Sequence, residues 1–407
     1  MATATRKPLL YNPFDPALRV DPYPIYHRLR ELDPVHRSPL GFWAFSRYDD
    51  VSRVQRDTSL GFFSQENVNR LAAAVRDASS PAAKIGRWLL FTDRIEHQRF
   101  RGLMNPFFSP RALERVRAVI EAEVEELLAG LPARGTTDLM STFAQLLPIN
   151  MLCTWLGIPR NDRERCRSWA ASIGRVLVSV LNPELIRSMA DAILACDAYV
   201  REQVAQRHRA PQDDLLTALL EAEFDGRPID DDELVANVIL LLGATYETTV
   251  NMIGNSILAL LRHPEQLELL RSDRSLLTGA VEELLRYDSP AQLHGRFNYD
   301  ELEVGGRLIP PESRLILLIG AANRDPDRFE DPDVLDVTRY DAKPLSFGGG
   351  PHYCLGAGVA RLESQICLSL LLDRFPRLRL VEEKIRWRSE PVALRALRAL
   401  PVELDAA

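Results

Sequence analysis

Apolar residues recur at helical spacing through most of the chain up to about residue 290. In 113–131 and in 139–156 they stand three or four residues apart, which predicts two amphipathic helices. Short strand patterns flank this helical region. They are Phe42–Phe45 near the start and 302–319, a stretch punctuated by glycine and proline that resembles a hairpin. We therefore expect a mainly α fold with a minor β-sheet region.

Two further helices are well delimited by their sequence. The first begins near Asp230 with an acidic first turn, stops at His263–Pro264, and would span roughly 45 Å. The second follows Cys354, and Pro376 ends it. Its apolar positions are Leu355, Val359, Leu362, Ile366 and Leu370. Between the two, 320–354 has little periodicity, so we expect a long ordered coil there, which tends to be functional in a compact domain.

Composition narrows the classes of partner. The formal net charge is -7, so no basic excess favours nucleic acid or an anionic membrane surface. The first residues lack the apolar stretch of a signal peptide. The longest apolar helix is interrupted by Glu247, Asn251 and Asn255, which a membrane-spanning helix would not carry without partners. We expect a cytoplasmic protein without a membrane anchor.

Five cysteines are scattered along the chain without a CxxC pair, which argues against zinc and disulfide sites and fits a reducing compartment. Four of them are expected to be small buried hydrophobic residues. They are Cys153, Cys166, Cys196 and Cys367. The fifth, Cys354, has a different setting.

Cys354 lies in the loop Phe347-Gly-Gly-Gly-Pro-His-Tyr-Cys-Leu-Gly356, just before a predicted helix N-terminus. A helix N-terminus and backbone N–H groups stabilise a thiolate, and the glycines would remove side chains that block such an approach. Two other interpretations stay open on the loop alone. It could be a turn around a buried cysteine, or a phosphate loop, although no Lys-Ser/Thr pair follows the glycines.

The spacing of Phe347, Gly350, His352, Cys354 and Gly356 resembles the haem-binding signature of the cytochrome P450 family. The resemblance implies that Cys354 is the axial ligand of a haem b iron, and thiolate ligation favours O–O cleavage. It also implies the P450 fold, with haem between the long central helix and the cysteine loop. Because similar stretches run along nearly the whole chain, we expect one P450 domain over residues 1–407.

Other family motifs follow in order. Glu283 and Arg286 resemble the ExxR pair, and the coil from 322 to 339 resembles the segment from which a second arginine, Arg339, joins that pair. By resemblance, the three form a buried structural network around the cysteine coil.

Haem carries two propionates, whose burial requires cations. His97, Arg101, Arg296 and His352 match positions that contact propionates in similar proteins. The alternative for each is a solvated surface charge.

Within the long helix, Gly243-Ala-Thr-Tyr-Glu-Thr-Thr249 is similar to the family's oxygen-activating pattern. We assign to Thr248 and Glu247 the delivery of protons to dioxygen, although they could instead form a polar face between packed helices. Thr245 departs from the family, where glycine is usual. We expect it to shape substrate fit while leaving oxygen activation intact.

The predicted pocket walls are mostly apolar, so a mid-sized hydrophobic molecule is the expected substrate. The predicted wall residues are Phe62, Phe63, Trp88, Leu89, Leu241, Ala244, Thr245, Gln292, Leu293 and His294. Of these, His294 is either a polar substrate contact or a solvated loop histidine.

The resemblance implies an external monooxygenase that hydroxylates or epoxidises a small molecule. Because no flavin, nicotinamide or iron–sulfur motif is present, we expect its electrons to come from another protein. Soluble relatives generally use a ferredoxin and its reductase, and we expect a monomer. A basic patch of Arg99, Arg101 and Arg361 would receive the acidic partner. The alternatives are a peroxide-driven or redox-neutral haem–thiolate enzyme and a non-catalytic haem sensor.

Overall fold

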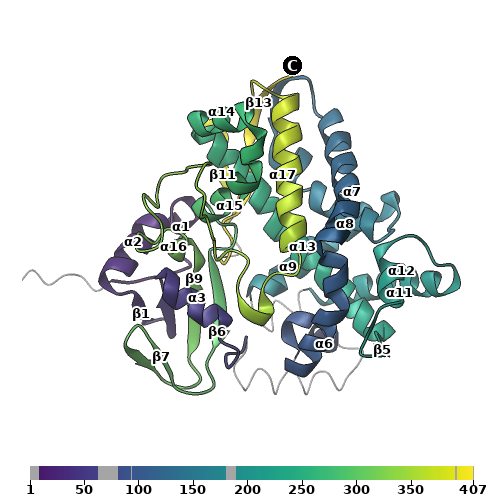
Figure 1. The fold of residues 1–407 in the computed structure, drawn as a ribbon, viewed down its shortest axis with the longest axis horizontal. Coiled ribbons are helices and arrows are strands. Elements are labelled where there is room, and N and C mark those ends of the chain that lie inside the picture. The colour runs from purple at the N-terminus through teal and green to yellow at the C-terminus, as the bar shows by residue number, and fades with distance from the viewer. Residues whose placement is uncertain (1–8, 63–80, 93, 180–188, 390–391, 407) are drawn as a thin grey trace, which may run out of the picture.

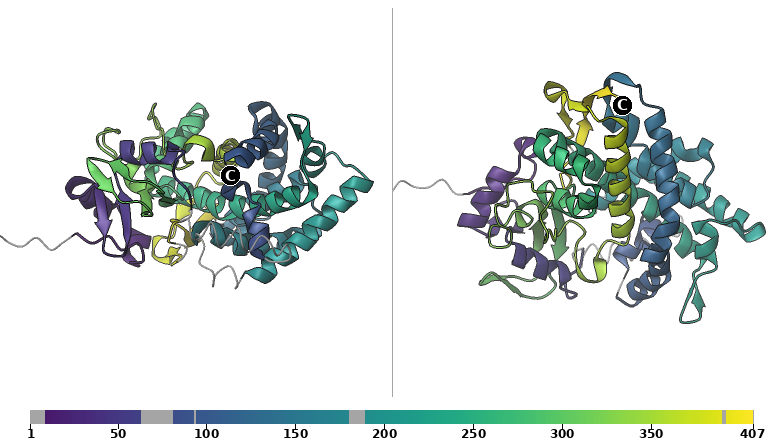
Figure 2. Two further views of the ribbon diagram at one scale, coloured as in Figure 1. Left: turned by 90° about the horizontal axis from the view of Figure 1, so that it is seen from below. Right: turned by 45° about the horizontal axis from the view of Figure 1, so that its top comes forward.

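The computed structural model describes residues 9–62, 81–92, 94–179, 189–389 and 392–406. A sheet region lies on one side and a larger helical region on the other, and this division persists in all three views (Figures 1 and 2). The sheet contains β1 (Val35–Ser38), β2 (Phe42–Phe45), β9 (Arg314–Leu318) and β6 (Leu293–Phe297), in that order. Because β2 pairs with β9 in parallel, the start of the chain is joined to its last third.

The central helix is α13 (Asp231–Arg262), and it begins where the sequence predicts. The Asp230 side chain accepts from the Glu233 N–H, and the Glu233 side chain accepts from the Asp230 N–H, which forms a capping box. By length and composition α13 could cross a membrane, but 72% of its most apolar window is buried inside the protein, as in a core helix.

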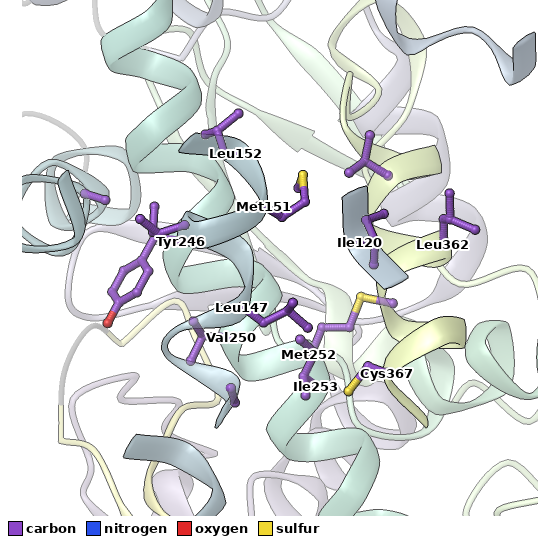
Figure 3. Close-up of a cluster of buried hydrophobic side chains, with 14 of the residues drawn as sticks. Ile120, Leu147, Met151, Leu152, Tyr246, Val250, Met252, Ile253, Leu362 and Cys367 are labelled. Atoms are coloured by element: carbon purple, nitrogen blue, oxygen red, sulfur yellow. The ribbon is translucent and has the colours of Figure 1, made fainter. Parts of the chain in front are cut away.

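Close packing surrounds α13. A Cβ added at Gly243 would lie only 2.5 Å from Ile173 of α9 (Arg163–Ser179), so glycine is needed where these two helices cross. On another face, α13 shares a hydrophobic core with α7 (Pro110–Ala129), α8 (Leu147–Trp155) and α17 (Ala357–Arg374), where Met252 and Cys367 lie close to each other (Figure 3). The core therefore fixes α13 relative to the helix that follows Cys354.

Two sequence predictions need correction. The segment 139–156 is not one helix but a π-helical turn, Met140–Ala144, followed by α8. Pro148 has no N–H to continue the helical ladder, which explains the break before it. The segment 302–319 is a hairpin only in part: β7 (Leu302–Val304) pairs with β8 (Arg307–Ile309), whereas β9 belongs to the larger sheet.

The predicted coil is confirmed. Between 320 and 354 the only regular elements are the end of α16 (Ile319–Ala322) and a short turn, Gly350–His352. The remaining described helices are α1 (Ala17–Val20), α2 (Tyr23–Leu32), α3 (Tyr48–Arg56), α5 (Pro81–Gly86), α6 (Arg94–Met104), α11 (Ala190–Arg209), α12 (Leu215–Leu220), α14 (Pro264–Ser272) and α15 (Leu277–Tyr287). The remaining strands are β3 (Arg134–Asp138), β4 (Glu223–Phe224), β5 (Arg227–Pro228), β10 (Arg379–Leu380), β11 (Arg386–Trp387), β12 (Leu397–Ala399) and β13 (Pro401–Asp405).

Candidate active site

A cavity of about 1450 Å³ lies between α13, α6, β6, the loop before α17 and the segment after β11. Its lining combines apolar side chains with a few charged ones. It brings together the following residues named from the sequence: Leu89, His97, Arg101, Leu241, Ala244, Thr245, Glu247, Thr248, Leu293, His294, Arg296, Phe347, His352, Cys354 and Gly356.

Cys354 is exposed to this cavity although it lies deep in the protein. Its N–H donates to the Phe347 carbonyl at 2.9 Å, which closes the loop. Burial raises the pKa of the Cys354 thiol, whereas a hydrogen bond from the Gly356 N–H and the charges of Arg101 and Arg361 lower it. The sulfur thus has the N–H donor and the nearby positive charges that stabilise a thiolate.

The structure explains the glycines of the cysteine loop differently from the sequence, which suggested that they let N–H groups approach the sulfur. Gly348 and Gly350 have φ angles of +77° and +65°, which side chains rarely adopt. A Cβ at Gly350 would also lie 3.0 Å from the Arg56 Cα of α3. These glycines permit the turn and its packing on α3. At Gly356, by contrast, a Cβ would meet nothing within 4 Å and would project into open space.

Four basic side chains meet in one part of the cavity. The rings of His97 and His352 lie 4.4 Å apart, and Arg296 is 6% exposed. Burial lowers the pKa of Arg296 to about 10, and burial together with the neighbouring cations lowers the pKa of His352 to about 3. Among the described residues, no carboxylate forms an ion pair with Arg101, Arg296 or either histidine. Cations without a carboxylate partner are costly to bury, so Arg101 and Arg296, with the His352 ring beside them as a neutral hydrogen-bonding group, fit acidic groups such as the two haem propionates.

The cavity-facing surface of α13 carries Ala244, Thr245 and Thr248. The Thr248 hydroxyl donates to the Ala244 carbonyl at 2.8 Å. Glu247 is 2% exposed, and its Oε2 lies 2.6 Å from Nη1 of Arg388, which follows β11. The other oxygen, Oε1, has no hydrogen-bond partner within the described part of the chain. The sequence did not reveal Arg388, because the residue is 141 positions from Glu247 and belongs to no motif.

Two predicted wall residues do not line the cavity. Trp88 is fully buried and stacks on Phe91, with ring centroids 6.0 Å apart, so Phe91 forms the wall in its place. Gln292 is buried, and its Nε2 donates to the Ser289 carbonyl at 2.8 Å. Phe62 does line the cavity, and Phe63 lies outside the described residues.

His294 is not a solvated loop histidine. It belongs to β6, lines the cavity, and has its Nδ1 3.2 Å from the Gln55 amide nitrogen. Burial lowers its pKa to about 3, so it is neutral at physiological pH. A neutral imidazole on the wall offers a hydrogen bond without a charge.

The predicted basic patch is wrong. Arg99 is 8% exposed and pairs with Glu96 at 2.8 Å and with Glu233 of α13. Arg361 pairs with Glu282, and Arg101 lines the cavity. Two of the three charges are therefore neutralised within the protein, and the third faces inward.

The structure joins Glu283, Arg286 and Arg339. Arg286 Nε and Nη2 lie 2.6 and 2.8 Å from the two Glu283 oxygens, and Arg339 Nε lies 3.1 Å from Glu283 Oε2. Arg286 also donates to three carbonyls of the coil, those of Asn323, Pro332 and Val334. The pair therefore attaches the coil that leads to Cys354 to α15.

Sequence reasoning missed Glu363 on α17. It is fully buried, lines the cavity, and neither carboxylate oxygen has a hydrogen-bond partner among the described residues. Burial raises its pKa to about 8. Its sequence neighbours gave no signal, because the apolar positions of α17 surround it.

Comparison with known proteins identifies this arrangement. Residues 175–396 match the family model described as "Cytochrome P450". The chain belongs to the cytochrome P450 family. It is 42% identical to "Cytochrome P450 107B1" of Saccharopolyspora erythraea over 402 residues, 96% of each chain. It is 36% identical to "Vitamin D(3) 25-hydroxylase" of Pseudonocardia autotrophica over 411 residues, 99% of each chain.

Among solved structures, epothilone D-bound cytochrome P450epoK has a TM-score of 0.88 at 32% identity, covering 98% of this chain and 99% of the other. The P450 fold expected from the cysteine signature is therefore confirmed. The chain is a haem-dependent monooxygenase of this family, a class that uses dioxygen, a small-molecule substrate and redox partners.

Proposed function

We propose that this enzyme inserts one oxygen atom from O2 into a mid-sized hydrophobic molecule of specialised metabolism, by hydroxylation or epoxidation. The observation that carries the proposal is that one largely apolar cavity is lined by Cys354, by Thr248 and by four basic groups that have no carboxylate partner among the described residues. The relative named a vitamin D(3) 25-hydroxylase supports a hydrophobic substrate.

In this proposal the cofactor is haem b, with Cys354 as the ligand of the iron. His97, Arg101, Arg296 and His352 bind the propionates, and Gly356 leaves room for the ring because it has no side chain. Phe347 lines the cavity at the start of the cysteine loop, with the Arg361 guanidinium 4.4 Å from its ring centroid. When bound, thiolate-ligated haem supplies the cleavage of the O–O bond.

In this proposal Thr248 and Glu247 deliver protons to dioxygen. The Thr248 hydroxyl faces the cavity and can rotate from the Ala244 carbonyl toward a bound molecule. Arg388 holds Oε2 of Glu247, whereas Oε1 has no hydrogen-bond partner in the described part of the chain, so Glu247 can exchange a proton with water through Oε1. Leu89, Leu241, Ala244, Thr245, Leu293 and His294 form the substrate wall.

Electrons come from an external ferredoxin and its reductase, and the enzyme works as a cytoplasmic monomer. Because Arg99 and Arg361 are already paired, the acidic partner must bind through other residues. Charge reversal at Arg361 should therefore act mainly by freeing Glu282, its ion-pair partner.

The test uses NADPH, a surrogate ferredoxin and reductase, and isotopically labelled dioxygen. We expect label in the product, and we expect Cys354→Ala to abolish turnover and the thiolate-type spectrum of the carbon monoxide complex. The matched control is Cys367→Ala, which changes a buried cysteine of α17 that does not line the cavity. This variant should retain turnover and the thiolate-type spectrum. Turnover with peroxide but not with dioxygen would instead favour a peroxide-driven enzyme, and haem binding without turnover would favour a sensor.

A further inference from the structure

One wall of the cavity is made by a segment with little secondary structure. Leu89, Leu90 and Phe91 all line the cavity, yet their only regular structure is a single 3-10 turn, Leu89–Phe91. A short irregular segment does not hold its own position, because few of its backbone groups bond within it. Its position must be fixed from outside.

Asn237 of α13 provides the contact. Its Oδ1 accepts from the Leu89 N–H at 2.7 Å, and its Nδ2 donates to the Arg87 carbonyl at 3.1 Å and to the Glu233 carbonyl at 2.9 Å. The side chain is 3% exposed and itself lines the cavity. One acceptor and two donors are needed here, and only a carboxamide supplies both.

Other links between this segment and α13 are weaker. Arg87 lies 3.3 Å from Asp232, but both side chains are about half exposed (40% and 46%), and exposed ion pairs contribute little. The Arg99–Glu233 pair is more buried but acts on α6, beyond the wall segment. Among the described residues, Asn237 is the buried side chain of α13 that hydrogen-bonds to the backbone of the wall itself.

Asn237 is also in register with the residues that face the reacting position. Asn237, Leu241, Thr245 and Thr248 follow one another at helical spacing and all line the cavity. Asn237 is the first of these four residues along α13, and its carboxamide hydrogen-bonds to the wall segment.

We propose that Asn237 is a positioning residue that fixes the wall segment 87–91 against α13 and thereby determines the size of molecule the cavity accepts. The part concerning selectivity rests on the proposed function, whereas the part concerning the wall does not. Without the amide, the Leu89 N–H and the Arg87 carbonyl lose their partner inside the protein, and the segment must move to find water. Leu89 and Phe91 would move with it and change the shape of the cavity.

The experiment compares Asn237→Leu and Asn237→Asp with a matched control, Asn298→Leu. Asn298 is equally buried at 1% and makes the same three kinds of bond, accepting from the Ser313 N–H and donating to the Asp300 and Pro310 carbonyls. It does not line the cavity. The aspartate variant keeps the acceptor for Leu89 but places an oxygen against two carbonyls, so it tests the two donors alone.

The first measurement is hydrogen exchange of the haem-loaded protein, followed in peptides that cover 85–92. We expect exchange to be about tenfold faster or more in Asn237→Leu, faster by a smaller factor in Asn237→Asp because the Leu89 N–H keeps its acceptor, and unchanged in Asn298→Leu. Unchanged exchange in the Asn237 variants would overturn the positioning role. This measurement requires no substrate and no turnover.

The second measurement is binding of imidazole and of the bulkier phenylimidazole, followed by the haem Soret band. We expect the ratio of the two dissociation constants to change by about fivefold or more in the Asn237 variants and to stay constant in the control. Faster exchange with an unchanged ratio would overturn the role in selectivity. Since azole binding requires only haem, failure of oxygen transfer would be seen separately, in the labelled-dioxygen assay.

Discussion

Thr245 and Thr248 are two hydroxyl residues on one face of α13, yet we assign them different roles. Both line the cavity, and the Thr248 hydroxyl donates to the Ala244 carbonyl, in the manner of a threonine that can also turn toward a ligand. Thr248→Ala should uncouple the enzyme: NADPH consumption continues, product falls by about tenfold or more, and hydrogen peroxide accumulates.

Thr245→Gly should have the opposite signature, and the two variants serve as controls for each other. Removing a β-branched side chain enlarges the cavity, so we expect altered substrate dissociation constants and product distribution with little additional peroxide. Peroxide yield and product profile, measured per NADPH consumed, distinguish the two roles. If Thr245→Gly raised peroxide and left the product distribution unchanged, the assignment to substrate fit would be wrong.

At the scale of the element, one side chain of α17, Glu363, should make the free energy of unfolding depend on pH. Burial raises the pKa of Glu363 to about 8, above the usual value of 4.5. An acid whose folded pKa is raised destabilises the folded state as pH increases from the unfolded pKa through the folded one. Between pH 6 and pH 8 the free energy of unfolding should therefore fall by about 2–3 kcal/mol from this group alone.

The matched variant is Glu363→Gln, which keeps the shape and removes the titration. Urea unfolding at the two pH values should show that about 2–3 kcal/mol of the pH dependence disappears in this variant. Glu125→Gln, at an exposed position of α7, should change nothing. An equal pH dependence in wild type and Glu363→Gln would mean that the carboxyl is already ionised in the folded protein.

The elements differ in how well the sequence predicted them. The start of α13 could be predicted because its capping box is local. The position of Cys354 before α17 could be predicted because the apolar spacing after it and Pro376 delimit the helix. The break at 145–146 was missed although Pro148 was visible, because the apolar spacing continues through it. Arg388 and Gln55 could not be found, since each meets its partner, Glu247 or His294, only through tertiary packing. The basic patch failed for the same reason: Glu233, which neutralises Arg99, is 134 residues away.

At the scale of the whole molecule, the question is what holds the long coil before Cys354 in place. Sequence alone could not answer it, because Glu-x-x-Arg pairs are frequent on helices. The chain contains several other such pairs, for example Glu114 and Arg117 on α7, which lie 3.5 Å apart and have exposed fractions of 72% and 42%. The Glu283–Arg286 pair differs from the Glu114–Arg117 pair in burial, because the side chains of Glu283 and Arg286 have exposed fractions of 0%.

This difference yields a prediction for the two pairs. Arg286→Lys keeps the charge but cannot make five hydrogen bonds, so it leaves Glu283 and three coil carbonyls poorly paired and should cost about 3–5 kcal/mol. Arg117→Lys should cost less than about 0.5 kcal/mol, because exposed pairs contribute little. Thermal unfolding and haem content of the purified proteins are the measurements.

Arg339→Gln keeps the prediction testable if Arg286→Lys fails to fold. Arg339 is 14% exposed and contacts only one side of Glu283, so its loss should lower the unfolding temperature and haem content without abolishing either. The network attaches the coil to α15, and the coil leads to the cysteine loop. We therefore expect haem affinity and unfolding temperature to fall together in this variant. An Arg339→Gln protein that unfolds earlier yet binds haem as tightly as wild type would mean that the network stabilises α15 without positioning Cys354.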